Sequence, residues 1–150
     1  MDTFDFKPIV DAPVDGGGSL ILRLCKPEEL SSFHALMARH HYLKGGRSAG
    51  DTLRYFAEID GTPVALLTWG SAAYKLKDRD HWIGWGLGLR KTRLKLVVQN
   101  RRFCLLLKRG ERPNLASQAL GACLRRLRTD WHAQFGYEPL VAETFVDPHG

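Results

Sequence analysis

The chain has 150 residues, 44% of them hydrophobic, and a formal net charge of +6. These proportions are typical of one globular domain with a core of its own. No apolar run approaches the roughly 20 residues of a membrane-spanning helix, so we expect no membrane partner. Three widely spaced cysteines in apolar surroundings indicate reduced thiols and a cytoplasmic protein rather than a disulfide framework.

The positive charge is concentrated in the middle of the chain. Residues 75–112 carry twelve Lys or Arg against three acidic residues, a net charge of +9. Residues 113–150 carry three basic and four acidic residues, a net charge of −1. This distribution predicts a polyanionic partner, DNA or another nucleic acid. A solvated basic face without a partner and a contact with an acidic protein are the alternatives.

The first part of the chain contains a leader and a predicted hairpin. Residues 1–19 are rich in Asp, Pro and Gly, so we expect a flexible acidic leader before a single α/β domain at 20–150. The elements that the patterns predict next are a strand at 20–25, a helix from Lys26 to about Leu43, a strand at 53–59, a turn at Asp60-Gly61 and a buried strand at 64–69.

The basic segment has less regular patterns. A helical turn is predicted at 71–76, and mostly loop at 79–90, because glycines and mixed charges interrupt any periodicity. A strand or edge segment is predicted at 94–98, and a second strand at 102–108. The Arg125, Arg126 and Arg128 group further along is read as the solvated face of a helix.

A strand–loop–long helix–strand unit organises the second half. Asn114 stands at the expected N-cap of a helix that runs to Gln134, and its side chain would accept from the first free amides. Gly136 ends the helix, and a strand follows at 140–146. The predicted apolar stripe of the helix is Leu120, Leu124, Leu127 and Trp131. This order predicts a crossover with the helix packed on a sheet. The helix N-terminus is a predicted anion site, and its proposed ligands are Arg109, Arg112, Asn114, Leu115, Ala116 and Ser117.

The order of elements resembles the GNAT acyltransferase fold. That resemblance implies a mixed sheet and a pantetheine cofactor whose pyrophosphate lies at the N-terminus of the helix after the central strand. Acyl-CoA is therefore the cofactor that the resemblance implies. Residues 109–116 do not contain the usual GNAT phosphate-loop pattern, and Pro113 removes one amide donor, so the cofactor is left unknown.

A more specific resemblance spans roughly residues 40–147. The segments that carry it are His41-Tyr42-Leu43, Leu53-Arg54-Tyr55, Trp69 with Ala72-Ala73, Arg79-Asp80-x-Trp82-Ile83-Gly84-Trp85, Arg90, Val97-Val98-x-Asn100-x-Arg102-Phe103, Asn114-Leu115-Ala116-Ser117, Asp130-Trp131 and Glu143-Thr144-Phe145-Val146-Asp147. This succession resembles the DruA-like proteins, which are associated with the Druantia anti-phage system and also occur beside transposable elements. The resemblance implies defence against, or processing of, foreign DNA. The family pattern continues beyond the last segment, so we expect a shortened member.

Arg79-Asp80 and the two tryptophans after them form the most unusual cluster. In the functional interpretation, Trp82 and Trp85 stack on bases while Arg79 holds a phosphate. In the structural interpretation, Arg79 and Asp80 form an ion pair, and both rings anchor a loop to the core. Arg90 and Arg102 complete the predicted nucleic-acid-binding set.

Three residues are candidates for catalysis. Glu143 lies on the predicted last strand among apolar neighbours, and a buried carboxylate there would serve as a general base. Its alternative is an ion pair with Arg102 or Arg90. Asp80 and Tyr42 complete the candidate set, and no His or Cys spacing indicates a metal site.

Two classes of function remain open. The first is an enzyme, a GNAT-like group transferase that modifies DNA. The second is a non-catalytic DNA-binding module that recruits other defence or transposition proteins.

Overall fold

The computed structural model describes residues 18–40, 50–108 and 110–145. The described part of the chain contains one sheet of five strands in the order β1-β2-β3-β4-β5. The first three neighbouring pairs are antiparallel, and β4 and β5 are parallel. The strands are β1 (Leu20–Leu24), β2 (Thr52–Ile59), β3 (Thr62–Ser71), β4 (Val97–Leu105) and β5 (Val141–Thr144).

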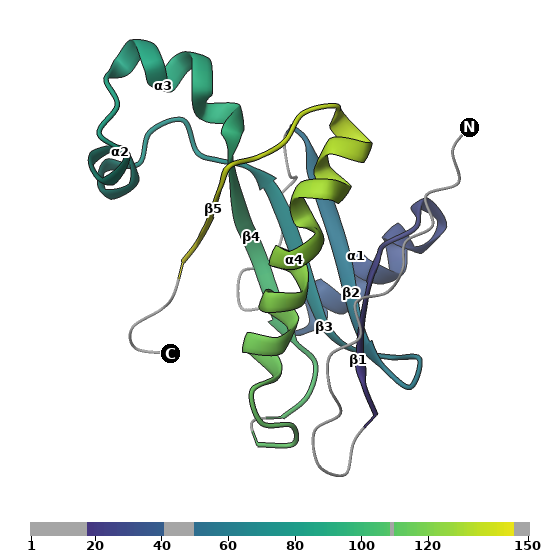
Figure 1. Cartoon of the computed structure of the whole chain (residues 1–150). Helices are drawn as coiled ribbons and strands as arrows, with labels where there is room; N and C mark the ends of the chain where they lie inside the picture. Colours follow the sequence, from purple (N-terminus) through teal and green to yellow (C-terminus); the bar gives the residue numbers. More distant parts are fainter. Residues whose placement is uncertain (1–17, 41–49, 109, 146–150) are drawn as a thin grey trace.

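The long helix α4 (Leu115–Phe135) connects β4 to β5 and lies across one face of the sheet (Figure 1). Its side chains Ala119, Cys123 and Trp131 are fully buried against strand residues that include Leu67. The other face is covered by α1 (Leu30–His40), which follows a 3-10 turn at Pro27–Glu29. The predicted mixed α/β sheet with a strand–loop–long helix–strand unit is confirmed.

The predicted hairpin between β2 and β3 is also confirmed. Asp60 and Gly61 both have positive φ, 51° and 76°, as the two central residues of a type I′ turn require. The turn brings Ile59 opposite Thr62 at the start of the antiparallel ladder.

The predictions for residues 71–96 were largely wrong. The residues at 71–76 form no helical turn, and the segment predicted as mostly loop contains two helices, α2 (Lys77–Ile83) and α3 (Leu87–Arg93). A 3-10 turn at Leu94–Leu96 replaces the start of the predicted strand. Each helix has only seven residues, so a period of 3.6 cannot repeat often enough to be recognised. Gly84, with φ 78°, ends α2 and made the segment resemble a loop.

Residues 74–96 are called the α2–α3 arm below. The arm leaves the sheet where β3 ends and rejoins it where β4 begins, and it projects beyond that end of the sheet (Figure 1).

The two strands predicted on either side of Gln99-Asn100-Arg101 are one strand, β4. The polar residues form an irregularity in the ladder with β3, between Thr68 and Trp69, and do not form a turn. Asn100 is buried there. Polar side chains at a bulge have the same sequence pattern as a loop, and this explains the error.

The predicted C-terminus of α4 is confirmed, whereas the predicted N-cap is only partly so. Gly136 ends the helix with φ 82°, as predicted. Asn114 occupies the N-cap position, but its backbone is left-handed and its side chain makes no capping hydrogen bond, so that part of the prediction was wrong. Its carbonyl accepts the first helical hydrogen bond from the amide of Gln118.

The basic group on α4 is not wholly solvated either. Arg126 is buried, whereas Arg125 and Arg128 are exposed. Arg126 donates to Asp130, 2.6 Å away, and to the carbonyl of Leu22 on β1. Its long-range partners could not be read from the helical pattern. Among the described residues, no helix is long and apolar enough to cross a membrane.

Candidate nucleic-acid interface

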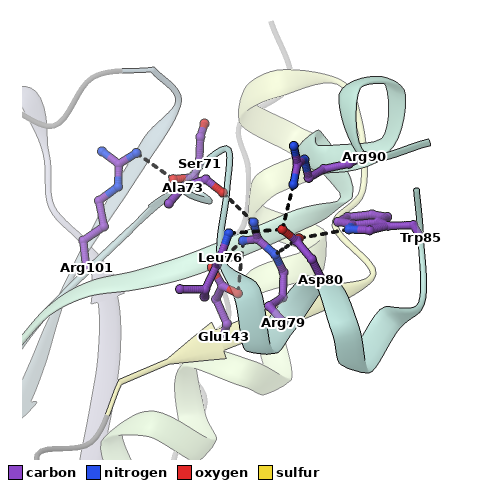
Figure 2. Close-up of polar contacts among 9 residues, drawn as sticks. All are labelled: Ser71, Ala73, Leu76, Arg79, Asp80, Trp85, Arg90, Arg101 and Glu143. Carbon is purple, nitrogen blue, oxygen red and sulfur yellow. Dashed lines mark hydrogen bonds and ion pairs between the residues drawn. The ribbon is translucent and has the colours of Figure 1, made fainter. Parts of the chain in front are cut away.

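Asp80 on α2 is the centre of a polar cluster at the base of the α2–α3 arm (Figure 2). Its two carboxylate oxygens accept four hydrogen bonds, from the backbone amide of Leu76, Nε of Arg79, Nε1 of Trp85 and Nη1 of Arg90. All four distances lie between 2.9 and 3.1 Å. Burial alone would raise the pKa of Asp80, but these donors outweigh it and hold the pKa well below its usual range.

Arg79 connects the arm to the sheet. Its side chain is 5% exposed, and every nitrogen of its guanidinium donates a hydrogen bond. Nε donates to Asp80, Nη1 to Glu143 on β5, and Nη2 to the carbonyl of Ala73 just after β3. Because these three acceptors lie on different elements, Arg79 fixes α2 against the sheet edge. With 5% of its side chain exposed, the Arg79 guanidinium faces these protein acceptors rather than solvent.

Glu143 is a largely buried carboxylate, with 11% of its side chain exposed. Its oxygens lie 3.1 and 3.4 Å from Nη1 of Arg79, a partner that was not predicted from the sequence. Burial raises the pKa of Glu143, and the charge and hydrogen bond of Arg79 only partly offset that effect. The catalytic role of Glu143 stays a prediction.

The two tryptophans of the arm have different environments. Trp85 is half-buried, and its indole nitrogen donates to Asp80 at 2.9 Å. The side chain of Trp82 is 77% exposed. The ion pair of the structural interpretation is therefore present, and Trp85 belongs to it, but Trp82 does not anchor the arm.

Arg90 on α3 is also an internal residue of the arm. It is 7% exposed, donates to Asp80 at 3.0 Å, and stacks its guanidinium over the ring of Tyr74 at 4.7 Å. Thus Arg79 and Arg90 hold the arm together, and their nucleic-acid-binding role stays a prediction.

The exposed cations of the arm were not singled out in the predicted set. They are Lys75, Lys77, Lys91, Arg93 and Lys95. The charge of the segment indicated that such residues exist, but charge alone does not show which basic side chains face solvent. That distinction depends on the acceptors supplied by Asp80 and Glu143.

Arg102 lies on β4, opposite Thr68 of β3. It is half-buried, and its Nη1 donates to the carbonyl of Arg101. Arg101 in turn donates to the carbonyl of Ser71 at 2.7 Å. In Figure 2 the Arg101 side chain lies at the left, apart from the cluster around Asp80. Arg102 is therefore placed on the sheet and not among the arm residues.

The residues predicted to hold a cofactor phosphate lie at the other end of β4. Glu143 pairs with Gln99 near the start of β4, whereas the N-terminus of α4 follows the end of that strand (Figure 1). Arg112 donates to the carbonyl of Gly18 and to the side chain of Gln118. Around it, Asn114 and Ser117 are exposed, Ala116 is half-buried and Leu115 is buried. The structure therefore does not bring the predicted cofactor residues together with Asp80 and Glu143.

Two predicted site residues, Tyr42 and Arg109, lie outside the described residues. Within the described residues, no group of three or more His, Cys, Asp or Glu side chains is placed to hold a metal ion.

A solved structure with a similar fold is a ribosomal-protein-alanine N-acetyltransferase from Brucella melitensis biovar Abortus 2308. The sequence identity is 13%, and the TM-score is 0.43 over 87% of this chain and 83% of that chain. At that TM-score we base no functional conclusion on the likeness. No curated protein shows significant sequence similarity to the chain.

The family described as Druantia protein DruA matches residues 18–149. The match includes the whole sheet, the arm and α4. We conclude that the chain belongs to the DruA family of Druantia proteins.

Proposed function

We propose that this protein acts in anti-phage defence as a nucleic-acid-binding module, and that the α2–α3 arm is its binding surface. Membership of the DruA family supports the defence role. The observation that carries the binding role is the composition of the arm surface. The arm carries five exposed cations against one exposed carboxylate, Asp78, and presents Trp82 to solvent, while the acidic side chain of Asp80 and both arginines around it are turned inward.

The inward cluster leaves the arm surface with a net positive charge, since Asp78 is the one exposed carboxylate of the arm beside five exposed cations. Asp80 is neutralised by contacts with Arg79 and Arg90, so it does not cancel the charge of the exposed lysines. Lys and Arg on such a surface contact phosphates and release condensed counterions, so affinity depends steeply on salt. Recruitment of other defence-system or mobile-element proteins to the bound DNA completes the proposed role.

Salt-dependent binding tests the proposal. Double substitution of Lys91 and Arg93 by Ala should weaken binding to DNA and lower the slope of log affinity against log salt by about one unit for each phosphate that the variant no longer neutralises. The matched control replaces Lys26 and Arg39 by Ala, because both are exposed cations beside or on α1, away from the arm (Figure 1). Wild-type protein without salt-dependent binding to single-stranded DNA, duplex DNA or RNA would refute the proposal.

A second candidate is a GNAT-like group transferase acting on DNA, with Glu143 as its general base. It is supported by the raised pKa of a buried carboxyl group beside Arg79. Acyl-CoA is the cofactor to test, with Arg112, Asn114, Leu115, Ala116 and Ser117 as its phosphate contacts. Glu143→Gln should abolish base modification, detected by mass spectrometry of nucleosides, while DNA affinity stays nearly constant. Arg112→Ala should weaken CoA binding, and an unchanged CoA affinity would place the site elsewhere.

A further inference from the structure

The side chain of Trp82 is the most exposed large apolar group among the described residues of the arm. It is 77% exposed, and the arm also presents Leu87 at 70%, Tyr74 at 55% and Leu89 at 49%. Single exposed apolar side chains are common, but four of them on one short segment with five exposed cations indicate a contact surface. The surface therefore combines apolar faces with positive charge.

The support beneath Trp82 is rigid. Trp82 follows Asp80 by two positions, which places it about 200° around the helix from the hydrogen-bonded carboxylate. Asp80 and Arg79 fix the inner side of α2 through contacts to Leu76, Ala73 and Glu143. The outer side therefore presents the Trp82 ring to solvent on a helix whose position is already fixed, and such preorganisation reduces the entropy lost on binding.

Unpaired bases fit this surface better than duplex DNA does. In a duplex the flat faces of the bases are stacked on each other, so an exposed indole has no base face on which to stack. In a single strand the base faces are accessible, and aromatic side chains in a positively charged surface bind them with little sequence preference. Trp85 is excluded as the stacking ring because its nitrogen is held by Asp80 and it is half-buried.

We propose that the α2–α3 arm binds single-stranded nucleic acid by stacking Trp82 on an unpaired base while exposed cations of the arm contact the backbone. This inference rests on the proposed nucleic-acid-binding function and names its substrate class. Single-stranded DNA and single-stranded RNA share the required chemistry, and the test separates them.

The test compares a short DNA strand without self-complementarity, its duplex and the RNA strand of the same sequence. The single strand should bind more tightly than the duplex. Trp82→Ala should lower single-strand affinity about 5- to 150-fold with the salt slope unchanged. Trp82→Phe retains a ring and should recover most of the affinity. A larger effect on DNA than on RNA would identify DNA as the ligand.

Tryptophan fluorescence gives an independent readout. Trp69 and Trp131 are buried, so a base that quenches emission must approach Trp82 or Trp85. The quenching should disappear in Trp82→Phe and persist in Trp85→Phe. The variants should keep the wild-type far-ultraviolet circular dichroism, because the Trp82 ring is exposed.

Two results would overturn this inference without affecting the proposed function. The first is equal affinity of the wild-type protein for the duplex and the single strand. The second is unchanged single-strand affinity in Trp82→Ala. In both cases the proposed function stands if the Lys91 and Arg93 variant still loses salt-dependent binding. Absence of binding to every nucleic acid would overturn both.

Discussion

Two clusters of buried arginines and carboxylates occur in this protein, and they have different surroundings. On α4, Asp130 accepts hydrogen bonds from Arg126 and from the hydroxyl of Tyr55, at 2.6 and 2.7 Å. Both donors are buried in the core between α4 and the sheet. In the arm, Asp80 and Glu143 are held by Arg79 and Arg90 at the edge of the sheet.

The apolar packing around the two clusters is not the same. α4 buries Ala119, Ala122, Cys123, Leu127 and Trp131 in addition to its polar residues. The buried residues of α2 and α3 are Arg79 and Arg90. Hydrophobic burial therefore holds α4, whereas hydrogen bonds and ion pairs fix the arm. The same chemical groups therefore stabilise the whole fold on α4 and position a peripheral surface in the arm.

The largest expected effect comes from breaking the core cluster. Asp130→Ala leaves Arg126 buried without its carboxylate, which should lower the free energy of unfolding by about 3–5 kcal/mol. Urea denaturation measures the change. Arg128→Ala is the control, because its ion pair with Glu138 is exposed and should contribute at most about 1 kcal/mol. An Asp130→Ala effect as small as that of the control would show that the core does not depend on this cluster.

Breaking the arm cluster should have a local effect. Arg79→Met removes the link between α2, β5 and the end of β3, so amide exchange should accelerate across Lys77–Ile83 and Leu87–Arg93 while β2, β3 and α4 stay protected. Nucleic-acid affinity should fall about tenfold, equivalent to about 1.4 kcal/mol, because the binding surface is no longer fixed.

Lys77→Met is the exchange control for that variant, since it also replaces a cationic side chain with methionine, but at an exposed position of α2. Faster exchange spread evenly over the sheet in Arg79→Met would contradict a separate role for the arm.

Substitution of two glycines in equivalent positions compares the stability of the arm with that of the core. Gly84 ends α2 with φ 78° and Gly136 ends α4 with φ 82°, and an added Cβ meets nothing within 4 Å at either position. Alanine at each site should therefore cost about 1–2 kcal/mol from backbone strain alone. Gly136→Ala should lower global stability in denaturation, while Gly84→Ala should chiefly increase amide exchange in the arm. Equal losses of global stability would show that the arm unfolds with the core.

The smallest effect at neutral pH concerns the carboxyl groups of the arm. The pKa of Asp80 lies below its usual 3.8, so its stabilising contribution is present above that pH and is lost as the pH falls further. The pKa of Glu143 lies above its usual 4.5, so its contribution is fully present below 4.5 and is lost as the pH rises through the folded pKa. Acidification should therefore protonate Glu143 first without loosening the arm, and only then Asp80, with loosening. Carbon-13 NMR titration gives the order, and Asp80→Asn should remove the acid-induced change in arm exchange.

Local sequence patterns were sufficient for several elements. Asp60-Gly61 specified the hairpin because a type I′ turn needs two residues that tolerate positive φ. The helical spacing after Asn114 and the glycine at 136 specified α4, since 21 residues allow the helical period to repeat many times. The buried face was predicted only in part, because Leu127 and Trp131 are buried but Leu124 is 49% exposed. Glu143 is largely buried, as expected, but the reason given from its neighbours was wrong, because Thr144 and Phe145 are exposed and the burial comes from contact with Arg79 of the arm.

The tertiary structure alone decided which charges are internal. The sequence by itself determined that residues 75–112 are strongly basic and that a carboxylate lies on the last predicted strand. It did not pair Arg79 with Glu143, because the two residues are 64 positions apart and meet only after α4 places β5 beside β4. Local periodicity reflects which face of one element is buried, whereas an ion pair between two elements depends on how those elements pack in the tertiary structure.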